Sequence, residues 1–267
     1  MSAVDDLFVK LKAEGKKALM PFITAGDPDL TFTAQLIESL AAQGCHMCEV
    51  GIPYSDPIAD GPVIQASYSR ALDKHVTLGG ILEMLGETSP KVTTPLVTMV
   101  SYAIVYRHGL AKYVQHAEAA GAAGLIVPDL PVEESAKLAE TCAAEDMSLI
   151  QLITPTTSAD RTKRIIETST GFLYYVSVVG ITGERTSLPS ELVDNVGQLR
   201  DQTDLPICIG FGINSPDHVR LLAPVADGLI VGSAIVRQVA ECGEKSPEAV
   251  RSQIEGYVGE LLAALDG

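Results

Sequence analysis

The segment ALMPFIT, residues 18–24, is a short apolar run that is typical of a buried parallel strand. An amphipathic helical stretch follows it, and a second apolar run, MCEVGI, occupies residues 47–52. The alternation continues along the chain, with further strand-like runs at residues 95–102, 124–130, 148–154, 171–178, 206–212 and 228–234. Eight such runs with helices between them predict an α/β fold, a closed (β/α)8 TIM barrel of parallel strands.

Two further features are expected around this barrel. The interval between the second and third predicted strands is about twice as long as most others and contains PYSDPIADGP and two helical patches, which predicts an insertion after strand two. The N-terminal stretch MSAVDDLFVKLKAEGKK has apolar residues at helical spacing and predicts an extra helix. A chain of 267 residues suits one barrel, so we expect a single catalytic domain over residues 1–267.

The charge balance limits the possible partners. Asp and Glu number 34 against 19 Lys and Arg, and the resulting charge of −15 disfavours nucleic acid and anionic membrane surfaces. We also expect no signal peptide and no apolar run of the roughly 18 to 20 residues that cross a bilayer. Five scattered cysteines suit free thiols, which favours the cytoplasm.

The inventory of reactive side chains excludes several kinds of chemistry. No Lys occupies the end of a predicted strand, which disfavours a Schiff base, and the five His lie in helix or turn contexts, which predicts no metal site. Cys45 and Cys48 form a CxxC, but no second pair accompanies it, so a structural role is favoured over zinc or redox chemistry.

Two carboxylates are the candidate catalytic groups. Glu49 lies inside the apolar run MCEVGI, where burial would raise its pKa toward neutrality and allow it to give and take protons. Asp60 follows in a loop restricted by prolines and a glycine. A structural ion pair for Glu49 and a surface turn for Asp60 are the alternatives. Asp56 and Asp129 are equally consistent with structural roles.

A phosphate site is expected after the last two strands. GFGINSP at residues 210–216 and VGSAIV at residues 231–236 each run from a strand into a helix start, where backbone N–H groups can bind an anion without Lys. GITG at residues 180–183 is a candidate third wall, although glycines also simply end strands. Aromatic residues that could line a pocket for a planar ring are Phe22, Tyr102, Tyr174, Tyr175 and Phe211.

The segment EVGIPYSDPIADG, residues 49–61, resembles the signature of the tryptophan synthase alpha subunit family. PFITAGDPD, VPDLPVEES, SVVGITG, GFGINSP and VGSAIV match the same family in the same order, so the chain is identified as a member of it. The resemblance implies a metal-free lyase that splits indole-3-glycerol phosphate into indole and glyceraldehyde 3-phosphate by retro-aldol cleavage. Glu49 and Asp60 match its two catalytic carboxylates.

The resemblance also implies the binding residues and the partner. The matching substrate-binding positions are Phe22, Tyr174, Thr182, Gly183, Phe211, Gly212, Gly232 and Ser233. The implied partner is a beta subunit that carries pyridoxal phosphate, in an α2β2 heterotetramer, whereas this chain needs no cofactor. Asp56 and its neighbour Pro53 lie in the loop that would communicate with that subunit.

Two positions depart from the family pattern, and three rival functions are possible alternatives. Cys48 stands where an aliphatic residue usually precedes the catalytic Glu, and Ile104 stands where relatives carry Asn. The rivals are another phosphate-binding barrel of the same pathway, a stand-alone indole-3-glycerol-phosphate lyase, and a silent barrel that only activates its partner. The first lacks EVGIPYSDPIADG, and retention of Glu49 and Asp60 argues against the last.

Overall fold

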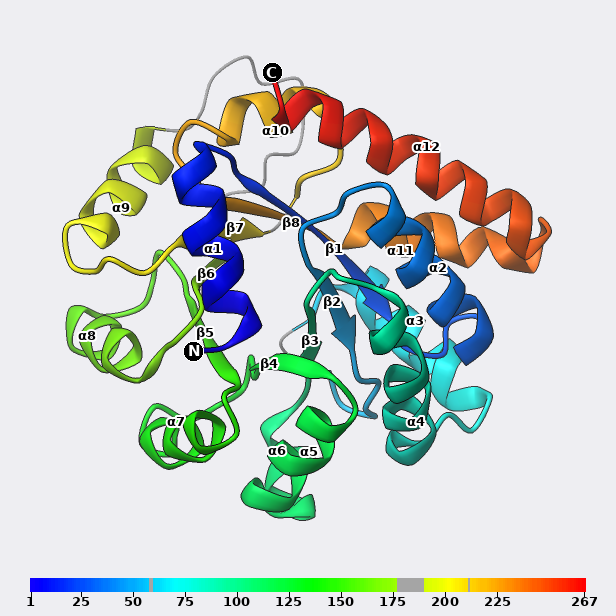
Figure 1. Ribbon diagram of the computed structural model, residues 1–267, viewed down its shortest axis with the longest axis horizontal. Helices are drawn as coiled ribbons and strands as arrows, with labels where there is room; N and C mark the ends of the chain where they lie inside the picture. Colours follow the sequence, from blue (N-terminus) through cyan, green and yellow to red (C-terminus); the bar gives the residue numbers. More distant parts are fainter. Residues whose placement is uncertain (58–59, 177–189, 211) are drawn as a thin grey trace.

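The computed structural model describes residues 1–57, 60–176, 190–210 and 212–267 and shows a closed eight-stranded barrel (Figure 1). Each strand pairs in parallel with the next, and the eighth closes on the first. The strands are β1 (Ala18–Thr24), β2 (Cys48–Gly51), β3 (Leu96–Met99), β4 (Ala122–Ile126), β5 (Ser148–Ile153), β6 (Leu173–Val176), β7 (Ile207–Gly210) and β8 (Gly228–Val231). The predicted TIM barrel is confirmed.

A ring of helices covers the outside of the barrel (Figure 1). They are α2 (Leu30–Ala42), α3 (Pro62–Asp73), α4 (Leu78–Thr88), α5 (Tyr102–His108), α6 (Leu110–Ala119), α7 (Ser135–Ala144), α8 (Ala159–Thr168), α9 (Ser190–Arg200), α10 (Pro216–Leu222), α11 (Ser233–Val239) and α12 (Pro247–Leu265), with short 3₁₀ turns η1 (Ser89–Lys91) and η2 (Ala240–Gly243). Both α3 and α4 lie between β2 and β3, which confirms the predicted insertion.

Alternation along the strands divides the core into two layers. Outward-facing residues such as Ile23, Val50 and Leu125 pack against the helices, whereas inward-facing residues such as Met20 and Ile126 fill the barrel. All of these side chains are buried, as expected for a parallel sheet covered on both faces.

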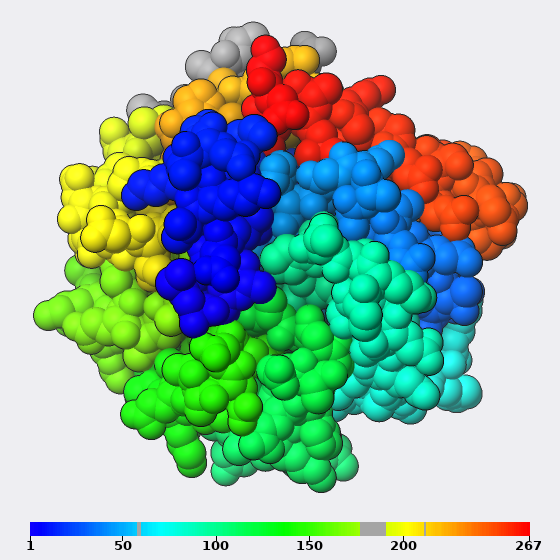
Figure 2. Space-filling view, viewed as in Figure 1, coloured from blue at the N-terminus to red at the C-terminus, as the bar shows by residue number. Residues whose placement is uncertain are grey.

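The predicted N-terminal helix is α1 (Ala3–Glu14), and it closes one end of the barrel. Ser2 and Asp5 form a reciprocal capping box, and the Gly171 backbone N–H donates to Asp5 Oδ1 at 3.0 Å. The rings of Phe8 and Phe172 lie 5.6 Å apart. Helix α1 lies across the centre of the face seen in Figure 2, so the open mouth is at the other end, where the strands finish.

Several strand boundaries differ from the prediction. The third strand ends at Met99 because the Ser101 hydroxyl accepts a hydrogen bond from the Ala103 N–H and starts α5. The eighth ends at Val231 because α11 begins at Ser233. The fourth is predicted over residues 124–130 but begins at Ala122 and ends at Ile126. Apolar runs that enter a helix look like longer strands in the sequence.

Candidate active site

Glu49 projects into the barrel near its open mouth. It lies on β2 in register with Phe22 on β1 and Val97 on β3, and the residue is 2% exposed. Neither carboxylate oxygen has a hydrogen-bond partner in the described part of the chain. Burial raises the pKa of Glu49 to about 8, and the negative charge of Asp60 adds to this rise. Glu49 is therefore protonated at neutral pH and is poised to donate a proton.

Asp60 supplies the second carboxylate, immediately before α3. Burial raises its pKa to about 6, opposed by the Tyr54 hydroxyl, which donates to Asp60 Oδ2 at 3.5 Å, and reinforced by the charge of Asp129. Between about pH 6 and pH 8, Asp60 is ionised while Glu49 keeps its proton. Two neighbouring carboxyl groups with separated pKa values suit one general acid and one electrostatic partner.

Helix α3 fixes the loop that carries Asp60. The Gln65 amide donates to the Asp60 backbone carbonyl at 2.7 Å, and the hydroxyls of Ser67 and Thr24 are 2.7 Å apart. The Arg70 guanidinium binds both carboxylate oxygens of Asp27, at 3.0 and 2.6 Å, and Asp27 is buried. These contacts tie α3 to the end of β1, so α3 forms a fixed wall of the mouth.

An aromatic wall stands beside the two carboxylates. An ideal Cβ on Gly51 would come within 2.5 Å of Phe22 Cζ, and one on Gly210 within 2.4 Å of Tyr174 Cε2. These two strand positions therefore have no room for a side chain, and the rings of Phe22 and Tyr174 occupy the space above them. Flat apolar faces next to two acids suit a planar ring with a polar edge.

The glycine-rich turns after β7 and β8 lie near this wall. Gly212 has φ +76°, a conformation that favours glycine, and an ideal Cβ on Gly232 would lie 3.5 Å from Phe22 Cβ. Helix α11 begins at Ser233, with Gly232 as its N-cap residue, and no side chain caps its N-terminus. Free backbone N–H groups there suit a phosphate. The predicted site residues Thr182, Gly183 and Phe211 lie outside the described residues.

Other candidates lie elsewhere or have different roles. Tyr175 packs in the outer layer, and the Tyr102 hydroxyl donates to Glu134 Oε2 at 3.2 Å, so neither joins the aromatic wall. Asp129 accepts hydrogen bonds from the Ser101 hydroxyl and the Tyr102 N–H, both at 2.7 Å, which makes it a structural link to the start of α5.

The two residues of the loop after β2 that are predicted to communicate with a beta subunit differ in their exposure to solvent. Pro53 is buried, whereas Asp56 is exposed and accepts a hydrogen bond from the Ser55 hydroxyl at 2.6 Å. The exposed position leaves Asp56 accessible to another protein. Its role in partner contact stays a prediction.

Sequence reasoning did not single out Tyr54 and Tyr68. Their rings pack 5.6 Å apart beside Asp60, with Tyr68 fully buried on α3. One sequence signal could have pointed to Tyr68. It lies at helical spacing with Ile64, Ser67 and Ala71, and together these residues form the inner face of α3.

Comparisons with known proteins agree with this geometry. The family model for the tryptophan synthase alpha chain matches residues 8–265. The chain belongs to this family. It is 58% identical over 250 residues to the alpha chain of Rhodopirellula baltica, covering 92% of this chain and 90% of the relative. It is 41% identical over 263 residues to that of Arabidopsis thaliana, covering 98% and 95%.

Solved structures show the same architecture. The tryptophan synthase subunit alpha of Legionella pneumophila superimposes with a TM-score of 0.90 at 35% identity, covering 100% of this chain and 99% of that one. The tryptophan synthase of M. tuberculosis in its aminoacrylate-bound form superimposes with a TM-score of 0.86 at 28% identity, covering 99% and 100%.

Family membership establishes the reaction class. Tryptophan synthase alpha chains are lyases of tryptophan biosynthesis that cleave indole-3-glycerol phosphate. They pair with a beta subunit, to which the pyridoxal phosphate cofactor belongs. In the described ranges, no group of three or more His, Cys, Asp or Glu could hold a metal ion, and no helix is long and apolar enough to span a bilayer.

The two departures from the family pattern have structural explanations. Cys48 is a free, fully buried thiol in the outer layer, where a small apolar side chain fits. Cys45 is also free and buried, and burial raises the pKa of both thiols, which favours the structural interpretation of the CxxC. Ile104 lies on α5, is half-buried and packs its apolar side chain against the outer core.

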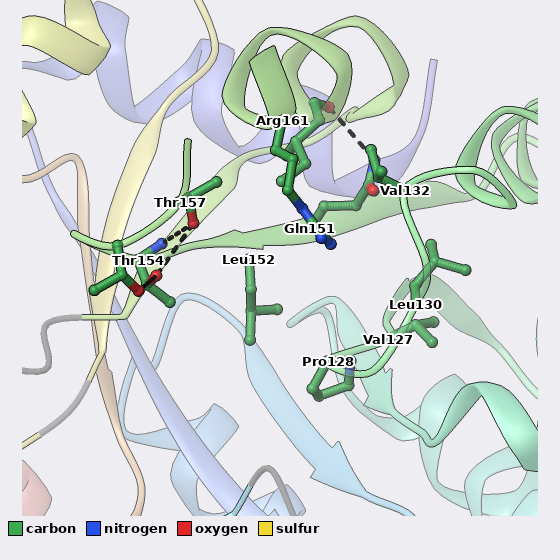
Figure 3. Close-up of a pocket in the computed structure, with 11 residues that line it drawn as sticks. Val127, Pro128, Leu130, Val132, Gln151, Leu152, Thr154, Thr157 and Arg161 are labelled. Atoms are coloured by element: carbon green, nitrogen blue, oxygen red, sulfur yellow. Dashed lines mark hydrogen bonds between the residues drawn. The ribbon is translucent and has the colours of Figure 1, made fainter. Parts of the chain in front are cut away.

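A separate cavity of about 260 Å³ lies between the loops after β4 and β5 (Figure 3). Its walls include Pro128, Leu130, Thr157 and Arg161. The Thr157 hydroxyl accepts from the Thr154 N–H at 3.0 Å and closes the turn at one side. Neither Glu49 nor Asp60 lines this cavity, so it is distinct from the carboxylate site.

Proposed function

We propose that this chain cleaves indole-3-glycerol phosphate at the open mouth of the barrel, with Glu49 as the acid–base group and Asp60 as its electrostatic partner. The observation that carries the assignment is the buried Glu49 carboxyl, whose two oxygens have no partner in the described residues and whose pKa is raised to about 8. Burying an acid without a structural partner lowers the stability of the fold, so its presence here indicates that the reaction uses it.

The cleavage needs one proton to enter and one to leave. Glu49 protonates the indole ring carbon that bears the glyceryl chain, and positive charge develops at the indole nitrogen. The ionised Asp60 accepts a hydrogen bond from the indole N–H and stabilises this charge. The Glu49 carboxylate then removes the proton of the adjacent glyceryl hydroxyl. The carbon–carbon bond breaks, its electrons return to the ring, and indole and the aldehyde are released.

The surrounding residues position the substrate. Phe22 and Tyr174 hold the indole ring, and backbone N–H groups at Gly212, Gly232 and Ser233 bind the phosphate, which keeps that anion away from the two acids. Thr182, Gly183 and Phe211 complete the substrate site on the strength of the family resemblance.

We further propose that the chain forms one domain and acts in the cytoplasm, where two copies of it assemble with two beta subunits as α2β2. Family membership supports this arrangement. The exposed Asp56 and the neighbouring Pro53 belong to the loop between the site and that partner. Indole formed at the mouth passes to the beta subunit for tryptophan synthesis.

The test is release of indole from indole-3-glycerol phosphate by the purified chain, alone and with a beta subunit. Slow release that the beta subunit accelerates, with one glyceraldehyde 3-phosphate per indole, is the expected result. Fast unaided release would support a stand-alone lyase instead. No release under either condition would contradict the proposal and indicate a silent barrel.

A further inference from the structure

Tyr68 has a buried hydroxyl that the fold does not use. The residue lies on the inner face of α3 and is 1% exposed, and its oxygen has no hydrogen-bond partner in the described part of the chain. The ring packs on Tyr54. Since buried hydroxyls almost always find a partner, an unpaired one beside a reaction site suggests a partner that changes during the reaction.

The position of this hydroxyl is fixed relative to β2. An ideal Cβ on Gly51 would lie 3.0 Å from Tyr68 Oη, in the space that the edge of the Phe22 ring also approaches. Gly51 and Glu49 are two residues apart on one strand, so both face the barrel interior. The Tyr68 hydroxyl therefore lies over β2, one inward-facing position nearer the mouth than Glu49.

The Tyr68 hydroxyl, a donor, and the Glu49 oxygens, which are acceptors, thus lie at successive inward-facing levels of the barrel without hydrogen-bond partners among the described residues. Within the described residues both Glu49 oxygens lack partners, whereas Tyr54, a second phenol near the acids, already donates to Asp60. A protonated Glu49 tolerates this apolar site, but the carboxylate left after proton transfer is a buried anion that needs a donor. Tyr68 is suitably placed to supply it.

We propose that Tyr68 is a positioning residue, whose hydroxyl donates a hydrogen bond to the Glu49 carboxylate after Glu49 has protonated the substrate. The bond stabilises the anion and directs its free oxygen toward the glyceryl hydroxyl, whose proton it takes next. No covalent bond to Tyr68 forms. This inference rests on the proposed role of Glu49.

The electrostatic surroundings keep Tyr68 in its donor form. Burial raises the pKa of its phenol well above the usual value, and the charges of Asp60 and Glu49 raise it further. The other titratable groups near the two acids are Asp129, whose charge acts on Asp60, and Tyr54 and Tyr174, whose pKa values burial also raises. Tyr68 therefore stays protonated across the pH range in which Glu49 and Asp60 titrate.

The test is Tyr68→Phe, which removes only the hydroxyl. Loss of a hydrogen bond to a charged group predicts a roughly 10- to 100-fold fall in kcat, with little change in KM. Without the donor the ionised form of Glu49 is less stable, so the limb of the pH–rate profile that reports Glu49 moves to higher pH. Tyr257→Phe is the matched control, because its buried hydroxyl also has no partner among the described residues but lies on α12. This variant should leave kcat and the profile unchanged.

A second variant should shift the Glu49 limb of the pH–rate profile in the opposite direction, and it tests the inference if Tyr68→Phe does not fold. Fluorotyrosine placed at position 68 keeps the ring and hydroxyl but makes a stronger donor, so the Glu49 limb moves to lower pH. An unmoved limb with wild-type kcat in either folded variant overturns the inference. Glu49→Gln separates the two levels: full activity in that variant refutes the proposed function, whereas its inactivity beside an unaffected Tyr68→Phe refutes only the role of Tyr68.

Discussion

Glu49 on β2 is the register partner of Phe22 on β1, so the carboxyl and the aromatic ring enter the barrel in the same layer. This pairing places an acid that burial keeps protonated directly beside the apolar surface on which an indole ring can lie. Asp60 approaches from the loop after β2, and its negative charge adds to the rise in the pKa of Glu49 that burial causes. The reaction scheme follows from this arrangement of one neutral acid, one carboxylate and one ring face.

The pH dependence of cleavage is predicted to be bell-shaped. Activity rises as Asp60 ionises near pH 6 and falls as Glu49 loses its proton near pH 8, because the scheme needs the first charged and the second protonated. The measurement is kcat/KM between pH 5 and 10. The substrate phosphate also titrates near the lower limb, so Asp60→Asn is the control: only the contribution of the phosphate remains there. A flat profile would contradict the assignment.

Replacement of Glu49 by Gln is predicted to stabilise the folded chain in a pH-dependent way. The ordinary pKa is 4.5 and the folded value is about 8, so between these values the unfolded chain releases a proton that the folded chain retains. Stability therefore falls as pH rises through this window and levels above it. Urea unfolding should show a gain for Glu49→Gln that grows from pH 5 to pH 9.

The matched control for this stability change is Glu87→Gln, an exposed carboxyl on α4. It should unfold like the wild type at both pH values. A gain for Glu49→Gln that is equal at pH 5 and pH 9 would show that the carboxyl is not kept protonated by the fold.

The pair of Asp27 and Arg70 is predicted to be a main support of the insertion. Arg70→Met leaves the Asp27 carboxylate, which is 2% exposed, without its bidentate partner and should cost about 3 kcal/mol in urea unfolding. Arg220→Met breaks the exposed pair with Asp217 and should cost less than about 1 kcal/mol. Equal losses in the two variants would contradict a structural role for the buried pair.

The closure of the barrel by α1 is predicted to matter for stability and not for catalysis. Asp5→Ala removes the capping box and the bond from the Gly171 N–H and should cost about 1 to 2 kcal/mol with unchanged kcat. Asp6→Ala, at the exposed neighbouring position, should have little effect. A large fall in kcat for Asp5→Ala, at a temperature where the variant is folded, would contradict the view that the α1 end of the barrel supports stability while the open mouth supports catalysis.

Most of the barrel could be predicted from the sequence because its information is local. Apolar runs such as residues 18–24 and 228–234 indicate strands, and the position of Glu49 inside such a run already marks a buried acid. The strand ends at Met99 and Val231 could not be placed, because in both cases the apolar run continues past the strand into the following helix, α5 or α11.

The two candidate catalytic carboxylates could be predicted from the sequence, but the residues that hold the site in place could not. Glu49 and Asp60 are recognisable by type and motif, whereas the roles of Tyr68 and Arg70 depend on how α3 folds back over β1, a long-range arrangement that spacing does not encode. Asp129 shows the converse, since its capping of α5 joins two loops that are distant in the sequence.

The most direct test of the central claim is indole release by Glu49→Gln at pH 7, with a beta subunit present and the binding of a phosphorylated substrate analogue measured in parallel. We predict a fall in turnover of about 100-fold or more, the usual cost of a lost acid–base group, with analogue binding retained. Near-normal turnover in this variant would contradict the account.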